Sequence, residues 1–366
     1  MRRVAAVASL LALIPVLVSY VQSVTQPSNS SVGILTVEWI RDHGGAGLIS
    51  SAEALYYSMT APSKGGPTLK ALPQVGVSAA APATGLLAPP RARPAYRPAR
   101  IRSVIRPALP GEGVWRATRA ISPRNSPVLL TTYRTDPNYP RLVAGVAWID
   151  AKKTAVLLYP GRREPSVPIP RGTATVPQRA RHRLLATFNS GFKISDARGG
   201  FALHGHTYAP MQDGVATLVG YRSGRIDIQS WRGGATVPAG VSFARQNLPL
   251  IVDHSRPNPN LSDGPQWGAT LGNAIRVWRS GVGVDRRGNL LYAASDKQTV
   301  GSLAAILIRA GAVRAMELDI NSYWTSFISY RAAGALRPSN LLSTMARAPT
   351  RYLTPDDRDF FAVYQR

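Results

Sequence analysis

The chain of 366 residues contains no cysteine. It therefore forms no disulfide, binds no zinc through thiolates and has no thiol nucleophile. This absence leaves the compartment open, because many exported proteins also lack cysteine.

Acidic residues and lysine are scarce as well. The chain has 44 basic and 19 acidic residues, so the formal net charge is +25. Six of the basic residues are Lys and the remaining 38 are Arg. Such a balance suits nucleic acid, anionic lipid or envelope phosphates as partners. Because the basic residues are spread along the chain and no basic block alternates with aromatic residues, we do not expect nucleic-acid binding.

Three common catalytic motifs are missing. The chain has no Gly-x-Ser-x-Gly nucleophile elbow, no phosphate loop of the Walker type and no dinucleotide fingerprint that opens a helix. A serine triad, an NTPase and a dinucleotide-binding enzyme are therefore poorly supported. Hydrophobic residues make up 45% of the chain, which is enough for a sizeable core.

The N-terminus carries a localisation signal. Arg2 and Arg3 precede residues 4–21, which are mostly apolar and carry no charge. A run of about 18 residues is near the lower limit for a membrane-spanning helix, and the positive start orients it with the N-terminus inside. We predict a membrane anchor or signal peptide over residues 1–24, with a single-pass, extracytoplasmic domain if it is retained and a secreted protein if it is cleaved.

Composition divides the rest into three parts. Residues 25–60 are predicted to form a short helical segment, broken at His43-Gly44-Gly45. Residues 61–111 are rich in Pro, Ala and Arg and predict a disordered linker. Residues 112–366 are predicted to fold as one domain in which strands outnumber helices. The expected fold class is α+β, with a mixed, largely antiparallel sheet and few helices.

One predicted strand has an unusual polar face. Residues 316–321 alternate, so that Glu317, Asp319 and Asn321 share one face and apolar residues the other. This strand follows an apolar helix predicted over residues 302–310. Two carboxylates on one face are unusual for a core strand and indicate a site of chemistry.

An ordered set of blocks resembles the phosphodiester glycosidase domain family. The blocks are a loop, Asn189-Ser190-Gly191-Phe192, then a hairpin that begins at Arg279, then the apolar helix, and then the strand that ends at Asp319. The resemblance extends over residues 140–335. Two positions depart from the family pattern: Ser190 replaces a glycine, and residues 320–324 replace a Gly-rich segment after the aspartate.

The resemblance implies hydrolysis of a glycosyl phosphodiester. That reaction needs a group that holds the phosphate and carboxylates that act on the sugar. We expect Arg279 to bind the phosphate and Asp319 to supply a catalytic carboxylate. Glu317 lies about 7 Å away along the strand and is the candidate for a second catalytic carboxylate. The alternative for each is a structural ion pair or a turn cap.

Four other residues are expected to bind substrate. Asn189 lies in the first loop, Asn321 would donate its amide to a sugar hydroxyl, His206 would line the cleft and Trp324 would stack on a sugar ring. The structural alternatives are a left-handed turn at Asn189 and ordinary core packing of Trp324.

No cofactor is predicted. His204-Gly205-His206 resembles part of a metal site, but the sequence offers no third ligand nearby, and we predict no transition metal. Calcium or magnesium at Asp285, Asp296 or Asp319 is left open, because hard cations need only oxygen ligands.

Two functions follow from these patterns. The first is an extracytoplasmic hydrolase that cleaves a glycosyl phosphodiester in envelope glycans or glycolipids, with an anionic glycan as substrate. The second is a non-catalytic envelope module that binds a phosphorylated glycan or a partner protein. The missing Gly-rich segment favours the second, because such a segment lets backbone amides approach a ligand closely.

Overall fold

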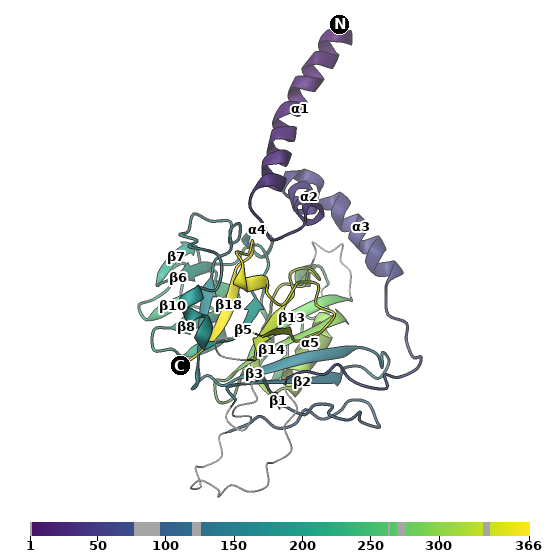
Figure 1. The fold of residues 1–366 in the computed structure, drawn as a ribbon, viewed down its shortest axis with the longest axis vertical. Helices are drawn as coiled ribbons and strands as arrows, with labels where there is room; N and C mark the ends of the chain where they lie inside the picture. The colour runs from purple at the N-terminus through teal and green to yellow at the C-terminus, as the bar shows by residue number, and fades with distance from the viewer. Residues whose placement is uncertain (1, 77–95, 119–125, 263, 269–275, 332–336) are drawn as a thin grey trace, which may run out of the picture.

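Antiparallel sheets make up the body of the protein, and a helical segment projects from one end of it (Figure 1). The computed structural model describes residues 2–76, 96–118, 126–262, 264–268, 276–331 and 337–366, without the side chains of residues 2–12 and Pro265. Within them the strands form three sheets and the helices are few. The predicted α+β class is confirmed.

The N-terminal helical segment comprises α1 (Arg2–Thr25), α2 (Val32–Ile40), the π-turn η1 (Arg41–Gly45) and α3 (Ala46–Met59). Ser31 caps α2 by accepting a hydrogen bond from the Ile34 amide. At the predicted break, His43 leaves the helical conformation and Gly44 adopts a φ of +88°, which glycine tolerates without a steric penalty. The predicted interruption of the helices is confirmed.

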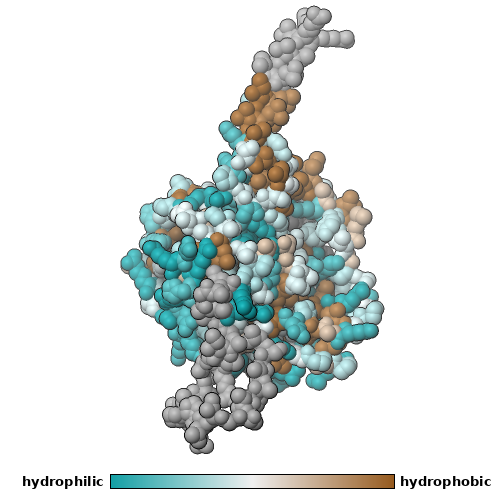
Figure 2. All heavy atoms as spheres, viewed as in Figure 1, coloured by the Kyte–Doolittle hydropathy of each residue, from teal (hydrophilic) through white to brown (hydrophobic). Residues whose placement is uncertain are grey.

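The described part of α1 exposes apolar side chains. Leu13, Ile14 and Leu17 are all more than half exposed, and Figure 2 shows the apolar surface of this helix where it leaves the body. None of the helices, as far as the structure describes them, is long and apolar enough to cross a membrane. Because Met1 and the side chains of residues 2–12 lie outside the description, the anchor or signal peptide over residues 1–24 stays a prediction.

Two described stretches of the predicted linker lie against the body. Residues 61–76 and 96–111 contain no helix or strand. Val75 and Ile101 are nevertheless buried in the clusters of apolar side chains that fill the domain. Residues 77–95, in the middle of the predicted linker, lie outside the described residues.

The first sheet is the largest. Its strands, in spatial order, are β1 (Arg116–Ala117), β2 (Val128–Arg134), β3 (Val143–Ile149), β14 (Leu290–Gln298), β13 (Val277–Asp285), β15 (Ala312–Glu317), β11 (Leu250–Asp253) and β12 (Arg256–Pro257). Helix α5 (Val300–Arg309) begins at a capping box between Thr299 and Ser302. Its buried residues, Leu303 and Leu307 among them, recur every three or four positions and pack on this sheet.

Two smaller sheets complete the body. One has the order β7 (His206–Ala209), β6 (Phe201–Leu203), β10 (Val241–Gln246), β8 (Ala216–Tyr221) and β9 (Ile226–Ser230). The other has the order β17 (Pro338–Asn340), β16 (Phe327–Tyr330), β5 (Leu184–Asn189), β18 (Phe360–Gln365) and β4 (Thr154–Tyr159). The short helices are η3 (Gln178–Arg183), α4 (Ile194–Ala197), η4 (Pro265–Trp267) and η6 (Arg351–Leu353).

Aromatic side chains join the sheets into one core. Tyr292 of β14 contacts Phe327 of β16 with ring centroids 5.0 Å apart, and Phe243 of β10 contacts Phe361 of β18 at 5.8 Å. The C-terminal strand β18 pairs with both β4 and β5, so the run 356–359 just before it lies beside the loop that follows Asn189.

A buried ion pair ties the described chain before β1 to the first sheet. Glu112 accepts hydrogen bonds from the Nε and Nη2 atoms of Arg134, and both side chains are buried. We predict that Glu112→Ala lowers the free energy of unfolding by about 3–5 kcal/mol, because it leaves the Arg134 charge buried without a carboxylate. Chemical denaturation measures the change, and a loss below about 1 kcal/mol would contradict it.

Candidate active site

The site is built where β15 ends. Glu317 lies opposite Gly281 of β13, and the chain continues beyond it in extended form. The Leu318 amide donates to the carbonyl of Ser280 at 2.8 Å, and the Asp319 amide donates to the carbonyl of Ser190 at 3.1 Å. Glu317 is therefore held by pairing within the first sheet, and Asp319 by a hydrogen bond to the loop that follows β5.

Glu317 forms a sealed ion pair with Arg279. The Nη1 atom of Arg279 lies 2.5 Å from Oε1 of Glu317, and both side chains are almost fully buried. The guanidinium also donates to the backbone carbonyls of Trp267, at 2.9 Å, and Gln298, at 3.2 Å. In this structure the Nε and Nη1 atoms of Arg279 therefore bind acceptors of the protein itself.

Burial changes the acidity of Glu317. Desolvation raises the pKa of this carboxyl to about 7, while the charge of Arg279 and its hydrogen bond oppose the shift. The second oxygen, Oε2, has no hydrogen-bond partner within the described residues. Glu317 therefore changes its protonation state close to neutral pH.

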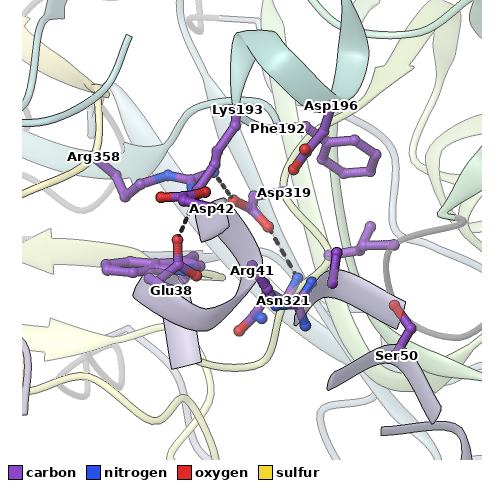
Figure 3. A pocket seen from close by; sticks show the side chains of 13 residues that line it. Glu38, Arg41, Asp42, Ser50, Phe192, Lys193, Asp196, Asp319, Asn321 and Arg358 are labelled. Atoms are coloured by element: carbon purple, nitrogen blue, oxygen red, sulfur yellow. Dashed lines mark hydrogen bonds and ion pairs between the residues drawn. The ribbon is translucent and has the colours of Figure 1, made fainter. Parts of the chain in front are cut away.

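Asp319 lies in a pocket instead. Its Oδ2 atom accepts a hydrogen bond from Nη2 of Arg358 at 2.6 Å, and its Oδ1 atom accepts one from the Asn321 amide at 3.0 Å (Figure 3). Burial raises the pKa of Asp319, although the Arg358 guanidinium opposes the shift. The arrangement provides a carboxyl group that faces a cavity and is easier to protonate than a surface aspartate.

Asn189 supports the loop that carries Asp319. Its amide donates to Oγ of Ser280 at 3.0 Å, and this hydroxyl donates to the carbonyl of Asp319 at 2.6 Å. Its carbonyl oxygen accepts from the Tyr292 hydroxyl at 2.9 Å and from the Ser326 amide at 3.0 Å. The side chain is buried and does not line the pocket, so in this structure Asn189 positions the site.

The pocket joins the body to the N-terminal helical segment. From the body it is lined by Phe192, Lys193, Asp196, Asp319, Ile320, Asn321, Trp324 and Arg358, and from the helical segment by Glu38, Arg41, Asp42, Ala46 and Ser50. In Figure 3 Arg358 contacts Asp319, and Glu38 and Asp42 lie on Lys193. The Nζ atom of Lys193 lies 2.5 Å from Glu38 and 3.1 Å from Asp42.

Two of the predicted substrate-binding residues line this pocket. The side-chain oxygen of Asn321 accepts a hydrogen bond from the backbone amide of Tyr323 at 2.9 Å, and the backbone amide of Asn321 donates to Asp319. Trp324 is buried, and the guanidinium carbon of Arg358 lies 5.3 Å from its ring centroid. The indole therefore already makes a cation–π contact with an arginine, and stacking of Trp324 on a sugar remains a prediction.

His206 lies apart from the pocket. It begins β7 in the second sheet, its side chain is exposed, and its ring packs on Tyr208 with centroids 4.6 Å apart. The predicted substrate-binding residue His206 does not line this pocket, and His204-Gly205 forms the tight turn that leads into β7. The turn requires positive φ angles at His204 and Gly205.

The described residues contain no cluster of three His, Cys, Asp or Glu that would hold a metal ion. Asp285 instead closes its hairpin, since its Oδ1 atom accepts the amides of Arg287 and Asn289. Its Oδ2 atom accepts a hydrogen bond from the Trp148 indole at 3.2 Å. This aspartate has a structural role that explains its position.

Sequence reasoning missed Lys193, Arg358, Glu38 and Asp42. The run Asp356-Asp357-Arg358-Asp359, placed directly before an apolar C-terminal strand, was the available signal for Arg358. No periodicity or motif could indicate that residues 38 and 42 reach a site at residue 319.

Comparisons with known proteins give distant likenesses. No protein-family model matches the chain, and no curated protein matches it. A hypothetical protein from Synechocystis matches with 15% identity and a TM-score of 0.39, over 66% of this chain and 62% of that one, which is less than two thirds of its length. The catalytic domain of zebrafish N-acetylglucosamine-1-phosphodiester alpha-N-acetylglucosaminidase, auto-inhibited by its pro-peptide, matches with 15% identity and a TM-score of 0.42, over 69% and 87%. Neither likeness establishes a family or an activity for this chain.

The raised pKa of Glu317 gives a pH prediction. In the unfolded chain this carboxyl ionises near 4.5 and in the folded chain near 7, so between these values the folded state binds more protons and stability falls as pH rises. We expect Glu317→Gln to remove this contribution. As pH rises from 4.5 to 7, the free energy of unfolding of the wild type should therefore fall relative to that of the variant. Denaturant titrations at several pH values test it, and a stability difference that does not change with pH would contradict it.

Proposed function

We propose that this protein is a hydrolase that cleaves a glycosyl phosphodiester. The observation that supports it best is the buried carboxyl of Asp319, which faces a pocket lined by the cations Lys193 and Arg358. The carboxyl lies at the position that the resemblance assigns to catalysis. An anionic substrate suits these cations, and the formal charge of +25 suits approach to a polyanionic envelope polymer.

The proposed chemistry centres on Asp319. Loss of a sugar from its phosphate develops positive charge on the anomeric carbon, and a carboxylate beside that carbon stabilises it or forms a bond with it. Phosphate leaves readily, so little general-acid help is needed. Because Asp319 is anchored by Arg358 and by the Asn321 amide, it is held ready in one orientation.

Glu317 and Arg279 act behind this carboxyl in the proposal. Glu317 lies two residues before Asp319 in the chain. Its ion pair with Arg279 is buried, and Arg279 also donates to the carbonyls of Trp267 and Gln298. It would fix the course of the chain as it leaves β15, which makes both of them positioning residues. Arg279 as a direct phosphate ligand and Glu317 as a second catalytic carboxylate remain alternatives that need a rearrangement of this pair.

A second candidate is a binding module without catalysis. Residues 320–324 replace the Gly-rich segment of the resembling family, and in their place Ile320 and Trp324 fill the wall of the pocket. Such a wall offers fewer free backbone amides to a ligand. In this reading the pocket would hold a phosphorylated glycan without turning it over.

For the location, we propose that the body lies outside the cytoplasm. The proposal is motivated by the two arginines and the apolar run at the N-terminus, and the N-terminal segment would then be either retained as a tether or cleaved. An envelope glycan or glycolipid that carries a sugar phosphodiester would be the substrate.

The hydrolase is tested with Asp319→Asn on a panel of sugar-1-phosphodiesters. We expect the wild type to release the sugar and the variant to lose at least about a hundredfold in kcat, because the carboxylate acts on the reacting carbon. Arg279→Ala should lose activity through misplacement of Glu317 and the strand end. Asp253→Asn is the matched control, since Asp253 is an exposed carboxylate outside the pocket.

Full activity in Asp319→Asn would overturn the catalytic role. Tight binding of sugar phosphates by a wild type that releases no sugar from any of the esters would favour the binding module instead.

A further inference from the structure

The cations of the pocket are occupied by the protein's own carboxylates. Lys193 contacts Glu38 and Asp42, which belong to α2 and η1, whereas Lys193 itself belongs to the loop after β5. The side chains of Lys193 and Glu38 are 12% and 17% exposed, so this pair is largely withdrawn from water. Asp42 is 59% exposed and contributes from the rim.

The charge of Glu38 is held by two cations from the body. Burial opposes ionisation, but the charges of Lys193 and Arg358 outweigh it and keep the pKa of Glu38 below its usual value. An oxyanion thus lies in the field of Lys193 and Arg358, next to Asp319, which Arg358 contacts directly.

We propose that Lys193 and Arg358 form a subsite for a phosphate group and that the Glu38 carboxylate occupies it as a removable stand-in. The inference rests on the proposed function only for the identity of the pocket, because binding of phosphate requires no turnover. A guanidinium and an ammonium are the usual protein ligands of a phosphate. A phosphate held here would lie beside Asp319, where the bond to the sugar is to break.

The contacts that hold the helical segment are those of a displaceable cover. In the described residues, α2 buries Leu35, α3 buries Ile49, and η1 buries no residue. Tyr57 of α3 also packs against the apolar cluster of Phe192, Val277 and Ile320. The other attachments that the structure shows are largely polar, including Asn29 on Asp356 at 3.0 Å and Arg163 on the carbonyl of Ser23 at 2.7 Å.

Each such hydrogen bond contributes about 0.5–1.5 kcal/mol net. A segment that was docked permanently would be expected to bury a broad apolar face. A phosphate that competes for Lys193 and Arg358 would directly displace the contacts of Glu38 and Asp42 with Lys193.

The test is titration calorimetry of inorganic phosphate into the full chain and its variants. We expect Glu38→Gln to bind phosphate at least about tenfold more tightly than the wild type, because the competing carboxylate is gone and the open subsite is more populated. Adding Lys193→Gln to Glu38→Gln should remove this gain. Asp253→Asn, which neutralises an exposed carboxylate outside the pocket, should leave the affinity unchanged.

Hydrogen exchange of the wild type provides a readout that needs no variant. Phosphate should speed exchange of the α2 amides compared with chloride at the same ionic strength. Equal phosphate affinity of Glu38→Gln and wild type, or α2 exchange that phosphate does not alter, would overturn the subsite.

The two proposals fail separately. Phosphate binding that depends on Glu38 and Lys193, without hydrolysis of any ester, would leave the subsite in place and remove the hydrolase. Hydrolysis that depends on Asp319, together with a phosphate affinity that Glu38→Gln does not change, would support the hydrolase and overturn the subsite.

Discussion

The ion pair between Arg358 and Asp319 is the interaction on which the site depends. It joins the C-terminal end of the chain, just before β18, to the end of β15, and it fixes a carboxyl whose burial would otherwise be costly. The same guanidinium lies over Trp324 and contributes to the field around Glu38. One arginine thus connects the central sheet, the pocket wall and the N-terminal helical segment.

Two carboxyls, two residues apart, have different environments. Glu317 is sealed with Arg279 beneath the strand, whereas Asp319 reaches a pocket. Alternation along a strand predicted that they share a face, but the chain leaves β15 after Glu317, and Asp319 pairs with the loop of Ser190 instead. Because of this local change of partner, Glu317 pairs with Arg279, whereas Asp319 pairs with Arg358 and lines the pocket.

Much of the fold follows from local pattern. The α+β class, the break at His43-Gly44-Gly45 and the apolar helix α5 could be predicted, because each depends on neighbours in the sequence. The polar end of the strand that leads to Asp319 could also be recognised, because two carboxylates on one face are unusual for a core strand. The contact between Glu38 and Lys193 could not be predicted, because it joins residues that only the tertiary fold brings together. His206 lies at the start of β7, directly after the tight turn at His204-Gly205, and does not line the pocket.

A crystal structure of the full chain soaked with a sugar 1-phosphate tests the account most directly. The account predicts the phosphate on Lys193 and Arg358, the anomeric carbon toward Asp319, and Glu38 withdrawn from Lys193. A sugar phosphate bound elsewhere, with the contact between Glu38 and Lys193 intact, would contradict it.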